Sequence, residues 1–204
     1  MRYVVSGYRR CGTGMMVRVL LHALPGRNVV CQPEKDKFLN KSINGYQPSP
    51  SGLYEVSPKH YMDPRYICKY LKDEHIIKVF FDGLPTLPVF KEEYAVIFML
   101  RNPDEIEKSL DLVKHYHAQI NKPETTITDH PLDVYKPYDQ TLINLVLDIV
   151  DVRSDMRLHL VHYEQFVENP LSELQKLVTL GLPLSNLEKA AEVVNPEFRR
   201  ARCG

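Results

Sequence analysis

The hydrophobic residues of this chain fall into short, nearly continuous runs that are separated by longer amphipathic segments. Continuous runs rich in β-branched and aromatic residues are typical of strands in a parallel sheet that is covered on both faces. The sequence predicts five such strands, at Tyr3–Ser6, Asn28–Cys31, Ile76–Phe81, Ala95–Leu100 and Leu158–His162.

Helical patterns lie between and after these strands. They are expected at about Thr13–Ala23, Pro64–Asp73, from Pro103 onward, Tyr138–Ser154, from Pro170 to the Gly181-Leu182-Pro183 turn, and Asn186–Val193. Asn102 and Asn169 each precede a proline, which is the order of an N-cap and a first-turn residue.

The alternation of strands and helices predicts a doubly wound α/β fold with right-handed crossovers, whose ligands bind at the carboxyl ends of the strands. Two long segments, residues 32–59 and 119–137, lack a regular pattern and are rich in turn-forming residues. Irregular segments of this length are usually functional lids or mobile loops.

Composition narrows the classes of function. The chain has 204 residues, equal numbers of acidic and basic residues, and a pI near 7.1, so no overall charge attracts nucleic acid or an anionic membrane. No apolar run reaches the roughly 20 residues that a membrane span needs, and we expect no signal peptide. The four cysteines show no paired spacing, which favours free thiols in the cytoplasm and no metal site.

The segment from Gly7 to Gly14 carries the clearest chemical pattern. A strand, a glycine-containing loop and a helix start together form an anion site, most often for phosphate. Gly7 and Gly12 have the spacing of the nucleotide motif G-x-x-x-x-G-K-[ST], but Thr13 and Gly14 replace its lysine and its metal-binding hydroxyl. The loop therefore favours a phosphate-containing ligand that needs no Mg²⁺, unless the glycines only make a turn.

Positive charge in this loop comes from Arg9 and Arg10, and a second candidate site follows the fourth predicted strand. That strand ends at Arg101, and Ser109 lies about two turns into the next helix. A guanidinium and a hydroxyl together suit a phosphate. The alternative is an Arg101 that pairs with a carboxylate and a Ser109 exposed on the helix.

Three separated segments together resemble the sulfotransferase family, which uses 3′-phosphoadenosine 5′-phosphosulfate (PAPS). They are the loop Ser6–Met15, the segment Phe98–Pro103 with Ser109, and Leu160–Phe166 followed by Asn169-Pro170 and Leu180–Pro183. A weaker match is Pro50–Glu55. The resemblance implies that residues 1–204 form a single domain of the P-loop type, with a central parallel sheet and helices on both faces.

The resemblance also implies which residues bind the donor. The 5′-phosphosulfate would be held by Gly7, Arg9, Arg10, Cys11, Gly12, Thr13, Gly14 and Met15, although Arg9 and Cys11 stand where the family has Pro and Ser. Arg101 and Ser109 would hold the 3′-phosphate, with added charge from Arg200 and its neighbours Arg199 and Arg202, unless these form a solvated tail.

Catalytic roles follow from the same comparison. Arg10 falls where the family places its catalytic Lys or Arg, and Lys78 matches another family lysine, but the histidine base that follows that lysine in better-known members is absent here. Glu55 and Asp82 are the candidate bases, since Asp82 follows two phenylalanines at an expected strand end, an apolar setting that strengthens a carboxylate as a base. His60 and His115 are weaker candidates.

The acceptor is expected to be a small molecule, a lipid head group or a sugar. Its pocket would be lined by Tyr54, His60, Tyr61, His115, Tyr116 and His117, because such rings stack on sugars and aryl groups, although ordinary packing explains them too. Two other classes of protein stay open: an ATP-dependent nucleotide kinase, against which the missing Gly-Lys-Ser/Thr argues, and a catalytically silent nucleotide-binding protein.

Overall fold

The computed structural model describes residues 1–32, 52, 54, 56, 60, 63–119, 144, 146–149 and 151–196. Its centre is a five-stranded parallel sheet in the order β2-β3-β1-β4-β5. The strands are β1 (Arg2–Gly7), β2 (Val29–Val30), β3 (Ile76–Lys78), β4 (Tyr94–Leu100) and β5 (Met156–His162). All five strands predicted from the sequence are present, so the α/β fold with a central parallel sheet is confirmed.

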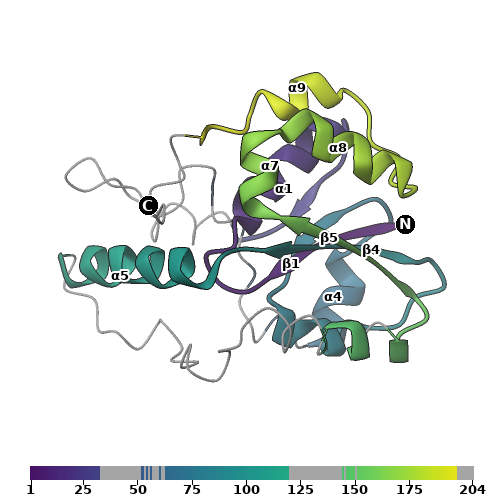
Figure 1. Cartoon of the computed structure of the whole chain (residues 1–204). Helices are drawn as coiled ribbons and strands as arrows, with labels where there is room; N and C mark the ends of the chain where they lie inside the picture. Colours follow the sequence, from purple (N-terminus) through teal and green to yellow (C-terminus); the bar gives the residue numbers. More distant parts are fainter. Residues whose placement is uncertain are drawn as a thin grey trace.

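Helices cover both faces of this sheet (Figure 1). On one face lie α1 (Thr13–Ala23), α7 (Tyr163–Glu168), α8 (Pro170–Thr179) and α9 (Leu187–Ala191), and on the other lies α4 (Pro64–Tyr70). The long helix α5 (Pro103–Gln119) follows β4 and extends away from the carboxyl edge of the sheet. Within the expected helix Tyr138–Ser154, the described residues 144, 146–149 and 151–152 are helical.

Two central strands form the middle of the core. Every residue of β1 and of β4 is buried, as continuous apolar runs predict. The edge strand β5 differs, because buried and exposed residues alternate along it and Leu160 is 40% exposed. The expectation of a sheet covered on both faces therefore holds for the centre and not for this edge.

The third strand is shorter than the sequence predicts. It ends at Lys78 instead of Phe81, and a 3₁₀ helix, η1 (Phe81–Thr86), follows. The amide of Gly83 donates to the carbonyl of Phe80 at 2.9 Å, and the hydroxyl of Thr86 donates to the carbonyl of Gly83 at 2.7 Å. The Asp-Gly-Leu-Pro sequence therefore forms a turn where its apolar neighbours predicted a strand.

The predicted helix starts are confirmed at two places. The amide of Asp104 donates to the side-chain oxygen of Asn102 at 2.9 Å, which caps α5 as expected. Helix α8 begins at Pro170, but the side chain of Asn169 makes no capping bond, and only its backbone carbonyl receives the amide of Glu173.

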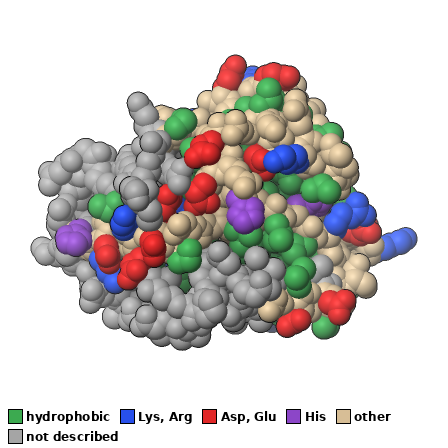
Figure 2. Space-filling model, viewed as in Figure 1, with side chains coloured by type: hydrophobic (Ala, Val, Ile, Leu, Met, Phe, Trp, Pro, Cys, Tyr) green, Lys and Arg blue, Asp and Glu red, His purple; other side chains and the backbone are tan. Residues whose placement is uncertain are grey.

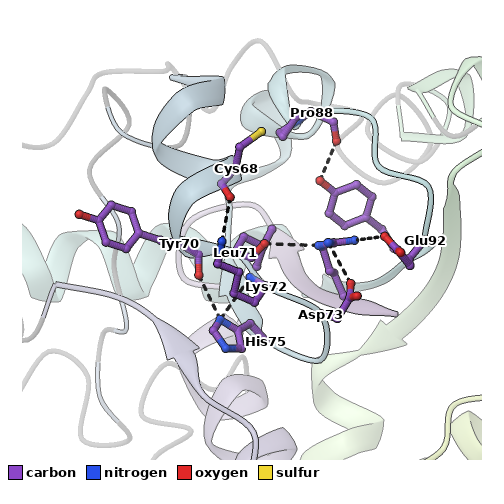
Figure 3. Close-up of polar contacts among 10 residues, drawn as sticks. Cys68, Tyr70, Leu71, Lys72, Asp73, His75, Pro88 and Glu92 are labelled. Atoms are coloured by element: carbon purple, nitrogen blue, oxygen red, sulfur yellow. Dashed lines mark hydrogen bonds and ion pairs between the residues drawn. The ribbon is translucent and has the colours of Figure 1, made fainter.

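A buried arginine fixes the amino end of the sheet. Arg2 donates to the carboxylate of Glu92 and to the carbonyl of Leu71, and it forms an ion pair with Asp73 (Figure 3). Its guanidinium carbon also lies 3.8 Å from the centre of the Phe90 ring. These contacts hold the chain at the edge opposite to the one where a ligand of this fold binds.

The described surface agrees with the balanced composition. Acidic, basic, histidine and hydrophobic side chains are interspersed over the described part of the face in Figure 2. Of the helices that the structure describes, none has the length and hydropathy of a membrane span. Cys11, Cys31 and Cys68 are free thiols. Cys203 lies outside the described residues, and the cytoplasmic location stays a prediction.

Candidate anion-binding site

The loop between β1 and α1 lies at the point where the strand order reverses. From β1 the chain crosses to β2 and β3 on one side and then returns to β4 and β5 on the other. In doubly wound sheets, ligands bind in the crevice outside the carboxyl ends of the two strands at this point. The ends of β1 and β4 place the loop after Gly7 and the residue Arg101 at that crevice.

The N-terminus of helix α1 has the features of an anion site. Its N-cap is Gly12, with no side-chain capping bond and no acidic residue in the first turn. Helix geometry leaves the N–H groups of Thr13, Gly14 and Met15 without an intrahelical acceptor. The positive end of the helix dipole therefore stays uncompensated by the helix's own side chains.

Close packing explains two of the loop glycines. Gly12 has φ +85°, and a Cβ there would overlap the ring of Tyr163. A Cβ on Gly14 would overlap the carbonyl oxygen of Gly52. The carbonyl of Gly52, a residue of the weakest sequence match, therefore lies directly against the first turn of α1.

Arg10, Ser109 and Arg101 come together across the crevice, although the first two are 99 positions apart. The Nε of Arg10 donates to the hydroxyl oxygen of Ser109 at 3.0 Å. Nη1 of Arg101 donates to the backbone carbonyl of Arg10 at 2.7 Å. Arg10 adopts φ 69°, a left-handed conformation uncommon for a residue with a side chain. The two sites that the sequence predicted separately are therefore one connected structure.

Arg101 also has a structural role. Its Nε and Nη2 each donate to one oxygen of Glu105 at 3.1 Å, and its guanidinium carbon lies 4.3 Å from the centre of the Tyr163 ring. Both members of this ion pair are buried. The pairing that the alternative interpretation expected for Arg101 is thus present, whereas Ser109 is buried and not exposed.

The other cations of the site lie beside a phenylalanine. The guanidinium carbon of Arg9 is 4.8 Å, and the ammonium nitrogen of Lys78 is 5.6 Å, from the centre of the Phe80 ring. Lys78 is 5% exposed at the end of β3, next to Val5 of β1. Positive charge therefore flanks the loop on the β3 side as well as on the β4 side.

Cys11 differs from the other predicted ligands. Its side chain is fully buried, and its amide donates to the carbonyl of Tyr8 at 3.3 Å. That bond closes the turn that carries Arg9 and Arg10. The buried thiol of Cys11 therefore shapes the loop, and its role in anion binding stays a prediction.

Of the two carboxylates predicted as the base, the structure describes Asp82 and not Glu55. Asp82 lies in the first turn of η1 with an exposed side chain, so the apolar strand end that made it attractive is not there. Glu55 lies outside the described residues, as do Arg199, Arg200 and Arg202. His115 is exposed, about 18 Å along α5 from Pro103, and its Nδ1 contacts the carbonyl of Asp111 at 2.8 Å.

The described rings among those expected to line an acceptor pocket make separate contacts. His60 stacks on Tyr66 with ring centres 4.6 Å apart, and its Nδ1 lies 2.8 Å from the side-chain nitrogen Nε2 of Gln32. The ring of Tyr54 packs against Gly52. Tyr61 and the side chains of Tyr116 and His117 lie outside the described residues.

A cavity of about 370 Å³ lies on the β2 side of the sheet. It is lined by Asn28, Val29, Val30, Cys31, Gln32, Tyr66, Tyr70 and His75. No residue of the Gly7–Met15 loop lines it. Within the part of the chain that the structure describes, no group of three His, Cys, Asp or Glu side chains is placed to hold a metal ion.

Sequence reasoning missed four residues of the site. Glu105 and Tyr163 hold Arg101, Glu164 accepts the amide of Asn102 at 2.9 Å, and Phe80 receives Arg9 and Lys78. Glu105 is four positions after Arg101, and this spacing is the signal from which the pair could have been predicted. The contacts of Tyr163 join positions far apart in the chain, and no local pattern indicated them.

Comparisons with known proteins were made on sequence and on structure. No protein-family model and no curated protein matches the chain. A mouse sulfotransferase, SULT7A1 complexed with PAP, is similar with a TM-score of 0.45 and 14% identity; the match covers 97% of this chain but only 63% of the mouse protein. An unliganded sugar kinase from Janibacter sp. HTCC2649 is similar with a TM-score of 0.34 and 12% identity, over 95% and 97% of the two chains. At these values the function has to be argued from the site itself.

Proposed function

We propose that this protein is a PAPS-dependent sulfotransferase that moves a sulfuryl group to a hydroxyl or amine of a small-molecule, lipid or sugar acceptor. One observation carries the proposal: the uncapped N-terminus of α1 opens between two groups of cations, Arg9 with Lys78 and Arg10 with Arg101. This arrangement suits a ligand with two separated anionic groups, as PAPS has.

The residues fit both anionic groups of such a donor. The N–H groups of Thr13, Gly14 and Met15, which have no acceptor within the helix, suit the 5′-phosphosulfate. At the other end, Ser109 accepts a bond from Arg10 and keeps its own hydrogen to donate to a phosphate oxygen. The contacts with Glu105 and Arg10 use three of the five N–H donors of Arg101, so within the described part of the chain two remain for the 3′-phosphate.

The donor supplies a sulfuryl group that is already activated by its bond to phosphate. In the transfer, the bond between sulfur and the bridging oxygen breaks and its electron pair stays on the 5′-phosphate. A new bond forms between sulfur and the acceptor oxygen or nitrogen, and the acceptor proton passes to a base or to water. Catalysis of such a transfer depends on positioning and on stabilising the developing charge.

The cations of the loop would supply that charge stabilisation. Arg10, Arg9 and Lys78 are the proposed donors, and removing one preorganised donor of this kind typically costs about 10²–10³-fold in kcat. Asp82 or Glu55 would take the acceptor proton. Asp82 follows by two residues Phe80, whose ring Arg9 and Lys78 approach.

The test uses ligands that distinguish a sulfotransferase from a kinase and from a silent nucleotide-binding protein. PAP at 100 times its Kd should stabilise the folded protein by about 2.7 kcal/mol, which a thermal shift detects. A screen of acceptors with ³⁵S-labelled PAPS should then give a labelled product. Phosphoryl transfer from ATP with Mg²⁺ would instead support the kinase, and PAP binding without transfer to any acceptor or to water would support a silent nucleotide-binding protein.

A further inference from the structure

The cavity of about 370 Å³ beside β2 is formed without any residue of the loop between β1 and α1. Residues 28–32 line it, together with Tyr66 and Tyr70 of α4 and with His75, which precedes β3. Sites for small molecules usually have volumes of about 300–1,000 Å³ and combine apolar and aromatic side chains with a few polar groups. The cavity therefore has the size and the composition of a ligand site.

The cavity follows the outer edge of the sheet. Strand β2 is the last strand in the order, and in the described sheet its partner is β3. The amide of Ile76 donates to the carbonyl of Asn28 at 2.9 Å, and in a parallel ladder alternate residues bond to opposite edges. The N–H and C=O groups of Val29 therefore point away from β3. Since successive side chains of a strand point to opposite faces, a cavity that touches all of residues 28–32 lies along this backbone edge.

The lining offers hydrogen bonds without a formal charge. Of the described residues that line the cavity, none is Asp, Glu, Lys or Arg. The side chain of Asn28 carries donors and an acceptor, and the backbone of Val29 adds one of each. The ammonium of Lys69 lies 5.0 Å from the centre of the Tyr70 ring, but Lys69 does not line the cavity. Such a set suits hydroxyl groups, which both donate and accept.

His75 adds a polar group whose ring is held in place. Its Nδ1 lies 3.0 Å from the carbonyl oxygen of Tyr70 and 3.3 Å from the backbone nitrogen of Lys72 (Figure 3). These contacts do not use Nε2, on the other side of the imidazole. A neutral imidazole nitrogen either donates or accepts, so His75 suits a ligand hydroxyl in either tautomer.

Two tyrosine rings supply the apolar part of the lining. Tyr66 and Tyr70 lie one helical turn apart, with ring centres separated by 4.5 Å and planes at 44°. His60 stacks on Tyr66 with ring centres 4.6 Å apart. Because these rings already pack on one another, a flat base has no place between them. The outermost ring, Tyr70, is 43% exposed and offers a surface on which the C–H groups of a sugar pack.

We propose that the cavity beside β2 is a second ligand site of this protein and binds an uncharged sugar ring. The ring packs against Tyr70, and its hydroxyls bond to the side chain of Asn28 and to the backbone of Val29. The inference goes beyond the proposed function and does not depend on it, because no residue of the donor site lines this cavity.

The experiment titrates ¹⁵N-labelled protein with three neutral probes: methyl β-glucoside, methyl β-galactoside and methyl β-N-acetylglucosaminide. Glucuronate is the charged comparison on a similar ring, and phenol is the aromatic comparison. At least one glycoside should shift the amide signals of Val29 and Tyr70 and leave that of Gly12 unchanged. It should bind more tightly than glucuronate and phenol.

Variants test the two parts of the lining. Asn28→Ala and Tyr70→Ala should each weaken binding of that glycoside by about fivefold or more, as expected for a lost hydrogen bond or a lost ring contact. Tyr70→Phe keeps the ring and should stay within about twofold of the wild type. Arg65→Ala is the matched control on α4, because its side chain is 93% exposed and does not line the cavity.

Two cysteines give a test that needs no variant. Cys31 lines the cavity, whereas Cys68 is exposed on α4 and does not line it. The bound glycoside should slow alkylation of Cys31 by iodoacetamide and leave alkylation of Cys68 unchanged, as measured by mass spectrometry of the peptides. This result stands even where thermal unfolding shows that an alanine variant is not folded.

The inference is overturned if no glycoside shifts the signals of Val29 and Tyr70 or protects Cys31, or if a folded Tyr70→Ala binds like the wild type. Tighter binding of glucuronate would show that a charged ligand is preferred, and tighter binding of phenol would show an aryl site; either result also overturns it. PAP should bind equally to the wild type and to Tyr70→Ala. A wild-type protein that does not bind PAP contradicts the proposed function alone, in a separate titration.

Discussion

The Nε of Arg10 donates to the hydroxyl oxygen of Ser109 at 3.0 Å, and this one bond joins the loop after β1 to the helix after β4. Both strands end at the same edge of the sheet, in adjacent positions. The bond therefore spans the crevice in which a ligand of this fold binds.

Replacing Ser109 by alanine removes the acceptor of that bond. We expect a loss of about 1 kcal/mol in the free energy of unfolding and about tenfold weaker binding of PAP, because a typical hydrogen bond contributes about 0.5–1.5 kcal/mol. Denaturant unfolding and calorimetric titration measure the two effects. Ser172→Ala, on the exposed face of α8, is the control that should change neither. Unchanged PAP binding in Ser109→Ala would show that the hydroxyl does not reach the ligand.

The buried pair Arg101–Glu105 should contribute strongly to the free energy of unfolding at the carboxyl edge of the sheet. Arg101→Met leaves the carboxylate of Glu105 buried without its main cation, and breaking such a pair costs about 3–5 kcal/mol. The double variant Arg101→Met, Glu105→Leu should recover most of the loss, because no buried charge remains. Denaturant midpoints measure both variants.

A surface pair gives the reference for that experiment. Arg157 and Glu93 are each about half exposed, so Arg157→Ala should cost at most about 1 kcal/mol. If Arg101→Met costs no more than this, the buried pair is not what holds the site. A large cost would also mean that activity lost with Arg101 must be separated from unfolding.

Gly12 and Gly26 form a matched pair for testing the contact with Tyr163. Their φ angles are +85° and +83°, so alanine adds the same backbone strain at both, about 1–2 kcal/mol. A Cβ on Gly26 has open space, whereas one on Gly12 overlaps the Tyr163 ring. Gly12→Ala should therefore cost about 1–3 kcal/mol more than Gly26→Ala. Equal melting temperatures for the two variants would contradict the close approach of this ring.

The parts of the fold that the sequence predicted are those set by local chemistry. Continuous apolar runs marked β1 and β4, and the Asn102-Pro103 pair marked the start of α5 through a capping bond that the structure contains. The end of β3 was missed because Phe80 and Phe81 are apolar while the Asp-Gly-Leu-Pro sequence after them forms a 3₁₀ turn.

The site was predicted less completely, for a related reason. Local motifs identified Arg10, Arg101 and Ser109, which the fold brings together. They did not show that Arg9 would turn to Phe80, because this contact depends on the strand order, which places β3 and β4 on opposite sides of β1. Tyr163 likewise reaches Gly12 only through the pairing of β4 with β5.

Stability should depend on pH through His159, a buried side chain in the middle of β5. Burial, and secondly the charge of Arg157, lower the pKa of His159 below its usual range. Its Nε2 has no hydrogen-bond partner among the described residues. In the unfolded chain His159 has the ordinary histidine pKa of about 6.5, so it binds a proton as the pH falls through this value. In the folded protein the imidazole stays neutral at that pH.

The direction in which stability changes with pH follows from that difference in bound protons. The stability contributed by a neutral His159 is complete above about pH 6.5 and decreases as the pH falls toward the lower pKa of the folded state. Asp155, whose pKa is lowered by its bond to Arg153, acts in a separate window below about pH 4. Denaturant unfolding from pH 8 to pH 5 should therefore show wild-type stability decreasing below pH 6.5. His159→Leu should flatten this slope, and Asp155→Asn should not. A slope that persists in His159→Leu would assign the pH dependence to another group.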